Sequence, residues 1–71
     1  MKIQEAVDEF LDKLQLYEQF SGLELQQFVS QKTGRNPFPD SCLRKMRNTR
    51  KAMDYKIRCV NNKKSFYRME L

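Results

Sequence analysis

Four polar residues between positions 41 and 48 have the types and the spacing to read duplex DNA. Counted from the first, they lie at i, i+3, i+4 and i+7, so a helix would carry them on one face. Arginine and lysine have donors that match guanine, and asparagine has the paired donor and acceptor that match adenine. Lysines at three further positions can bind phosphate. The candidate DNA-binding residues are therefore Ser41, Arg44, Lys45, Asn48, Lys51, Lys63 and Lys64.

The segment from residue 41 to 53 contains no acidic residue that would neutralise its bases. A helix that is basic only for solubility usually mixes charges of both signs, because like charges on one face repel. A partner that supplies negative charge is therefore expected, although a simple solvated face remains the alternative. We expect Arg47 and Arg50 to flank this face or to point inward, in ion pairs with acids of the first helix.

Charge is distributed unevenly along the 71 residues. Residues 1–31 carry two lysines and six acids, a net −4, whereas residues 32–71 carry twelve bases and three acids, a net +9, which together give +5. A single compact domain of this length would present one basic face. Nucleic acid and anionic membrane are the usual partners of such a face.

The composition does not indicate an enzyme, a metal or a cofactor. The chain has no histidine, only two glycines and only two cysteines, which excludes a proton-shuttling histidine, a glycine-rich phosphate loop and a four-ligand zinc site. Asp8, Glu9 and Asp12 are expected to form a solvated acidic face. Cys42 and Cys59 are expected to be reduced and partly buried. A charged N-terminus and the lack of a long apolar run favour a cytoplasmic protein without a membrane span.

Three helices are expected to position the basic residues. The first covers about residues 2–15, where apolar residues recur every three or four positions from Ile3 to Tyr17. The second covers about 22–33, with Ser21 and Glu24 in a capping box, Phe20 and Leu25 as a hydrophobic staple, and Gly34 as its stop. The third covers about 40–53 and follows a linker in which Pro37 and Pro39 break the helix. Phe38, between them, is expected to fill the core.

A β-hairpin is expected over about residues 55–70. Tyr55, Ile57 and Cys59 alternate with basic residues, and Tyr67 and Met69 alternate on the return. The segment 61–64 forms the turn, because asparagine tolerates positive φ and two lysines follow it. The fold class is thus mainly α with a small β-hairpin, an α+β domain.

This order of elements resembles the winged helix-turn-helix proteins of bacteria and their phages. The resemblance rests on SGLELQQFVSQKTG as the supporting helix, PDSCLRKMRNTRKAMD as the recognition helix and YKIRCVNNKKSFYRM as the wing. It implies one winged-helix domain over 1–71, with helix 40–53 in the major groove and the wing at 61–64 on the backbone. Residues 16–20 would supply a small first strand. The linker at 34–39 is longer than the tight turn of simple helix-turn-helix proteins.

The resemblance implies sequence-specific binding of double-stranded DNA by a small transcriptional regulator. Two other functions stay open. One is a protein-interaction module, because the basic face could meet an acidic protein and the acidic first helix could bind a partner or a second copy of the chain. The other is RNA binding, for which the deep, narrow groove of A-form RNA is less suited to a helix.

Overall fold

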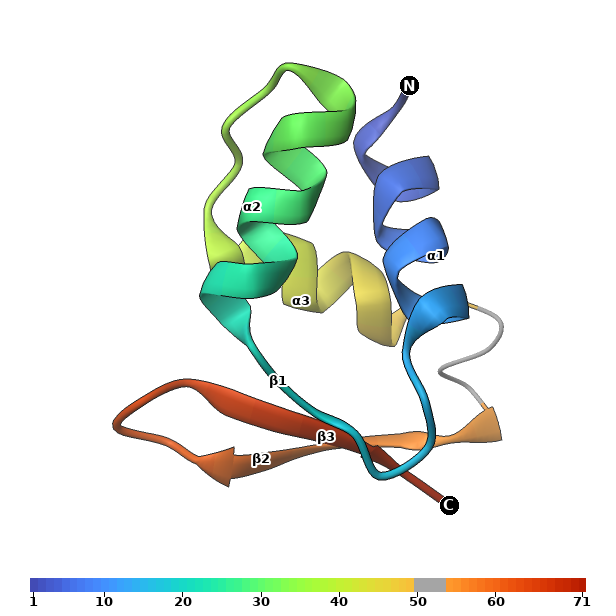
Figure 1. Ribbon diagram of the computed structural model, residues 1–71, viewed down its shortest axis with the longest axis vertical. Helices are drawn as coiled ribbons and strands as arrows, with labels where there is room; N and C mark the ends of the chain where they lie inside the picture. The colour runs from blue at the N-terminus through green and yellow to red at the C-terminus, as the bar shows by residue number, and fades with distance from the viewer. Residues whose placement is uncertain (50–53) are drawn as a thin grey trace.

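The computed structural model describes residues 1–49 and 54–71 (Figure 1). In these residues three helices lie over one side of a three-stranded antiparallel sheet, whose strand order is β1-β3-β2. The fold is therefore α+β. The elements are, in chain order, α1 (Ile3–Lys13), β1 (Gln19–Ser21), α2 (Gly22–Thr33), α3 (Pro39–Arg47), β2 (Lys56–Asn61) and β3 (Phe66–Glu70).

Helix α1 follows the predicted apolar stripe for most of its length. Ala6, Val7 and Leu11 are buried, and Leu14, which caps the helix, is 7% exposed. The prediction that Tyr17 continues the stripe was wrong: its side chain is 56% exposed and its backbone has φ 67°. The chain turns there to bring β1 to the sheet, and the Tyr17 amide donates to the Met69 carbonyl at 2.7 Å.

Helix α2 begins and ends where the sequence predicts. Ser21 is the N-cap, and its Oγ accepts a hydrogen bond from the Glu24 amide at 3.0 Å. Phe20 and Leu25, the predicted staple pair, are both buried. Gly34 ends the helix in the left-handed conformation, with φ 70°, a region that glycine enters without the steric cost of a Cβ.

Helix α3 begins at Pro39, and Phe38 is its N-cap. The expectation that Phe38 fills the core was wrong, because its side chain is 80% exposed. The helix was also predicted to continue through Asn48, but it ends at Arg47 with Asn48 as its C-cap. The Thr49 hydroxyl donates back to the Met46 carbonyl at 2.9 Å, a local bond that competes with a continuing helix. The predicted continuation over 50–53 lies outside the described residues.

The hairpin and the short first strand match the expected alternation. Ile57 lies opposite Met69 and Cys59 opposite Tyr67, so the four apolar residues share one face of the sheet. On its other side β3 pairs with β1, where Phe20 lies opposite Tyr67. This short strand ties the start of α2 to the hairpin.

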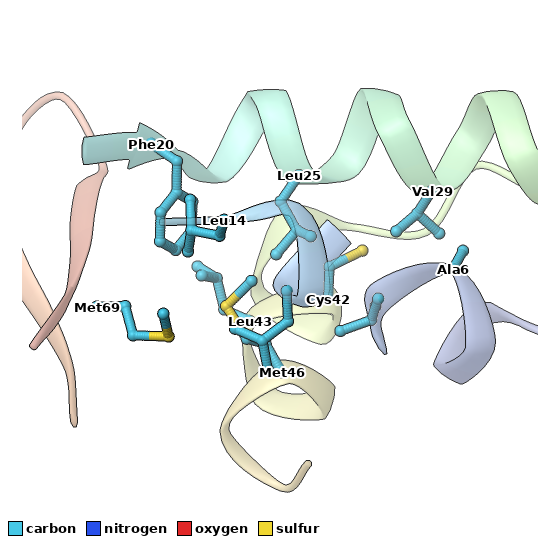
Figure 2. Packing of buried hydrophobic residues seen from close by; sticks show 11 residues of the cluster. Ala6, Leu14, Phe20, Leu25, Val29, Cys42, Leu43, Met46 and Met69 are labelled. Atoms are coloured by element: carbon cyan, nitrogen blue, oxygen red, sulfur yellow. The ribbon is translucent and has the colours of Figure 1, made fainter. Parts of the chain in front are cut away.

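The core lies between the three helices and the inner face of the sheet (Figure 2). Phe10 contacts both Phe20 and Phe28 edge-to-face, at centroid distances of 5.6 and 5.4 Å, and so joins α1 to α2. Cys42 and Met46 are fully buried under these helices and fix the inner side of α3. The opposite side of α3 must therefore face solvent.

Candidate nucleic-acid interface

The solvent-facing side of α3 carries most of the predicted DNA-binding residues. Ser41, Arg44 and Asn48 are exposed, as their spacing predicts. Asn48 lies at the C-cap rather than inside the helix, yet its backbone is still right-handed helical, with φ −88° and ψ −2°. Arg47 is also exposed, but it flanks this side, because it lines a pocket with Lys56, Arg58 and Glu70 of the hairpin. We name Ser41, Arg44 and Asn48 the α3 outer face.

Lys45 does not lie fully on that face. It is half-buried, and its carbonyl accepts a hydrogen bond from Gln4 Nε2 of α1 at 3.3 Å. Its side chain lines a shallow pocket with the first residues of the chain, including Glu5. The prediction that Lys45 is one of the four outward residues was therefore only partly right. A helical wheel ranks Lys45 as outward, but it does not show that α1 packs along this edge.

The hairpin turn carries two more of the candidate DNA-binding residues. Lys63 and Lys64 are both exposed, and the Lys64 amide donates to Asn61 Oδ1 at 3.2 Å. Ser65 closes the turn in the left-handed region, with φ 55°. The two adjacent lysines therefore lie on a turn whose backbone is stabilised by the hydrogen bond to Asn61. Lys51, the remaining candidate, lies outside the described residues.

Gly22 connects the hairpin turn to the start of α3. Its amide donates to the Ser65 carbonyl at 3.0 Å, directly after the two lysines. A Cβ at Gly22 would lie 3.5 Å from Pro39 Cβ and 3.7 Å from Tyr67 Cε2. In Figure 1 the turn projects on the side where α3 begins. Gly22 of α2 thus lies between the end of the hairpin turn and the first residue of α3.

The bases of this region have no acidic partner within the part of the chain that the structure describes. No ion pair within 4.0 Å joins Arg44, Arg47, Lys63 or Lys64 to a carboxylate there. The expectation that Arg47 pairs with acids of the first helix was wrong. For Arg50, the same expectation lies outside the described residues. The α3 outer face therefore keeps its positive charge, with Asp40 in the first turn as the nearest acid in sequence.

Glu9 of α1 pairs instead with two lysines outside this region. Glu9 pairs with Lys13 at 3.4 Å and with Lys32 at 3.3 Å, which joins α1 to α2. Both lysine Nζ atoms also lie over the Phe28 ring, at 5.4 and 5.5 Å from its centroid. Hydrogen bonding from Lys32 holds the pKa of Glu9 below its ordinary value, and Lys13 adds to this effect. This network stabilises the helix pair and includes none of the bases of the α3 outer face or the hairpin turn.

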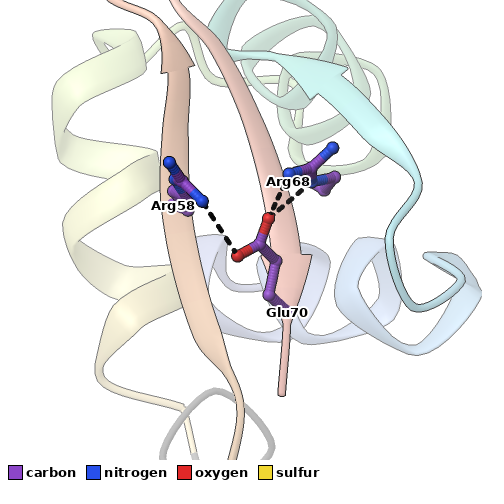
Figure 3. Close-up of polar contacts among 3 residues, drawn as sticks. All are labelled: Arg58, Arg68 and Glu70. Carbon is purple, nitrogen blue, oxygen red and sulfur yellow. Dashed lines mark hydrogen bonds and ion pairs between the residues drawn. The ribbon is translucent and has the colours of Figure 1, made fainter.

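A second group of bases, on the outer face of the sheet, was not predicted as a site. Figure 3 shows Glu70 between two arginines. Its carboxylate accepts from Arg68 Nε at 2.6 Å and lies 3.7 Å from Arg58 Nη1. Lys56 is exposed on the same strand face as Arg58. The alternation of the hairpin identifies these residues as outward, but only the strand register shows that they gather around Glu70.

The two cysteines are unpaired, as expected, but they differ in environment. Cys42 is fully buried, and burial raises the pKa of its thiol, an effect that the charge of Lys45 partly offsets. Cys59 is exposed, so the expectation that both are partly buried was wrong for it. No group of three or more histidine, cysteine or acidic residues suited to a metal ion occurs over residues 1–49 and 54–71.

Two exposed apolar residues near the basic region were also missed. Phe38 is 80% exposed and Leu23 is 58% exposed. For Phe38 the one signal is the pair of flanking prolines, which restrict the backbone there. For Leu23 the only signal is its position in the first turn of α2, outside the Leu25 and Val29 stripe.

These elements define a small α+β domain with a basic helix face and a basic hairpin turn. Comparisons of the chain with models of protein families, with curated proteins and with solved structures found no match. Over the described residues, no helix is both long and apolar enough to cross a membrane.

Proposed function

We propose that this protein is a winged-helix DNA-binding protein, a small transcriptional regulator that reads duplex DNA in the cytoplasm. The element order α1-β1-α2-α3-β2-β3 and the sheet order β1-β3-β2 suit this class. In the proposal, α3 enters the major groove and the hairpin turn contacts the backbone. A helix fits the width of the major groove, where each base pair presents a distinct pattern of donors and acceptors.

The observation that carries the proposal is the unneutralised charge of the α3 outer face. Arg44 on this face and Arg47 on its flank are exposed and have no carboxylate within 4.0 Å in the described part of the chain. Arg44 supplies bidentate donors suited to guanine O6 and N7, and Asn48 supplies the pair suited to adenine. Lys63 and Lys64 would neutralise phosphates and release counterions.

A protein-interaction module is the second candidate function, and one observation favours it. Phe38, directly before α3, and Leu23, in the first turn of α2, expose apolar surface, and such surface occurs at protein interfaces. The acidic surface of α1 offers a contact for a partner or for a second copy of the chain. Under the DNA-binding proposal, two such copies would read two half-sites.

A selection from random duplexes tests the proposed function. The protein should enrich a defined sequence, and that duplex should bind more tightly than a scrambled duplex or a structured RNA of equal length. A recovered motif with two-fold symmetry would indicate a dimer. Failure to enrich any sequence, or tighter binding to RNA, would reject the proposal. Capture of an acidic protein that survives nuclease treatment would favour the interaction module.

A further inference from the structure

Phe38 is the most exposed large apolar side chain that the structure describes, at 80%. It is internal to the chain, whereas the next in order, Leu71 at 70% and Met1 at 59%, are terminal residues. An exposed ring contributes little burial to folding, since the hydrophobic effect scales with the area removed from water. Its exposure therefore calls for an explanation outside the core.

The backbone holds Phe38 in place. Pro37 and Pro39 fix φ on both sides of it. The Phe38 carbonyl accepts hydrogen bonds from the Ser41 and Cys42 amides, at 3.1 and 3.2 Å, which begins the helix. With its backbone fixed, the residue has little chain entropy to lose when the ring is buried against a partner.

The position of Phe38 indicates what kind of partner buries it. It is the N-cap of α3, and the N-terminal residues of a recognition helix are those that approach base edges. The Gly22 amide donates to the Ser65 carbonyl, and a Cβ added at Gly22 would lie 3.5 Å from Pro39 Cβ, so the backbone of the hairpin turn ends near this end of α3. The partner must therefore combine negative charge with apolar groups. In the major groove of DNA, the apolar group is the C5-methyl of thymine.

We propose that Phe38 reads thymine by packing its ring against C5-methyl groups in the major groove, with Leu23 as a second apolar contact. The inference rests on the proposed function and adds to it the base that the N-terminus of α3 prefers. Leu23 is 58% exposed in the first turn of α2, directly after Gly22, whose amide donates to the Ser65 carbonyl of the hairpin turn. Arg44, six residues further along the chain and less than two helical turns away, would then read a neighbouring base pair.

Replacement of thymine by uracil tests this directly, because it removes only the methyl group. The probe is the duplex that the wild-type protein recovers from a random pool, synthesised with thymine or with uracil at each thymine position in turn. Wild-type affinity should fall about fourfold at one or two positions, the effect of one buried methyl group. Phe38→Ala should weaken binding to the thymine duplex and then show no further loss with uracil.

The controls separate this inference from the function on which it rests. Leu71→Ala removes another exposed apolar side chain, at the far end of β3, and should keep the wild-type response to uracil. Circular dichroism should show that Phe38→Ala is folded. Equal losses of affinity with uracil for wild type and Phe38→Ala would overturn the inference. Unchanged affinity of Phe38→Ala for the thymine duplex would also overturn it, and would assign the ring to a protein partner. If the wild-type protein recovers no duplex, the proposed function fails before any variant is measured, and the inference fails with it.

Discussion

Arg58 of β2 lies directly opposite Arg68 of β3, so two positive charges form a cross-strand pair. Like charges in this position destabilise a sheet. Glu70 relieves the repulsion, because its carboxylate pairs with both guanidinium groups. The hairpin that carries the turn lysines therefore depends on one acid for its stability.

Glu70→Gln should destabilise the protein by about 0.5–1 kcal/mol, since the carboxylate is partly exposed and its ion pairs are screened by water. Urea unfolding at low and at high salt measures the effect. The loss should shrink at high salt, which screens the repulsion between the arginines. Asp54→Asn removes one exposed negative charge elsewhere and should leave the unfolding midpoint nearly unchanged. Equal effects of the two variants would contradict the role given to Glu70.

Glu9→Gln should make stability less dependent on pH. The pKa of Glu9 is lowered in the folded state, so its contribution is present in full above its ordinary value of 4.5 and is lost as pH falls through the lower folded value. Urea midpoints of wild type and Glu9→Gln should therefore differ at about pH 6, and the difference should shrink as pH falls below 4.5. A difference that persists at low pH would show that the Lys13 and Lys32 pairs are not its cause.

Gly34→Ala should destabilise the protein by about 1 kcal/mol, because alanine is strained at φ 70° although the space around it is open. Gly22→Ala is the matched control: its Cβ would lie at ordinary contact distances, 3.5 to 3.7 Å, from three side chains. Thermal unfolding should show little change for Gly22→Ala. A larger loss of stability for Gly22→Ala than for Gly34→Ala would mean that packing, and not backbone conformation, decides the cost of a side chain at these positions.

Much of the fold was predictable because its signals are local. The Ser21 cap, the Gly34 stop and the alternation of the hairpin each depend on neighbouring residues, and the structure confirms all three. The predicted strand before Ser21 is also present as β1. The errors had two causes. The end of α3 was missed because a local bond from Thr49 back to Met46 competes with the helix pattern, and the partial burial of Lys45 was missed because it depends on the distant helix α1.

The candidate site was predictable in its residue types but not in its full extent. Helical spacing identified Ser41, Arg44 and Asn48 as outward, and all three are exposed. Phe38, between the two prolines of the linker, was expected to fill the core because large apolar residues are often buried, but it is exposed. The meeting of Ser65 with Gly22 was also missed, because no spacing within the sequence reveals it.

Removing the turn lysines should weaken DNA binding without changing the preferred sequence. In the double variant Lys63→Ala with Lys64→Ala, the slope of log affinity against log salt should fall by about one to two units, because each phosphate contact contributes about 0.9. Titrations across salt measure it. Lys2→Ala, which removes a lysine from the acidic half of the chain, should keep the wild-type slope. An unchanged slope in the double variant would exclude the turn from the interface.

The most direct test of the proposed interface compares two single arginine variants on the duplex that the protein selects. Arg44 lies on the α3 outer face, whereas Arg35 is an exposed arginine in the linker after α2. Arg44→Ala should lose about 1–3 kcal/mol of binding free energy on the selected duplex, the value of a bidentate contact to guanine, and little on a scrambled one. Arg35→Ala should bind both duplexes as the wild type does. Equal affinity of wild type and Arg44→Ala for the selected duplex would contradict the assignment of α3 as the helix that reads DNA.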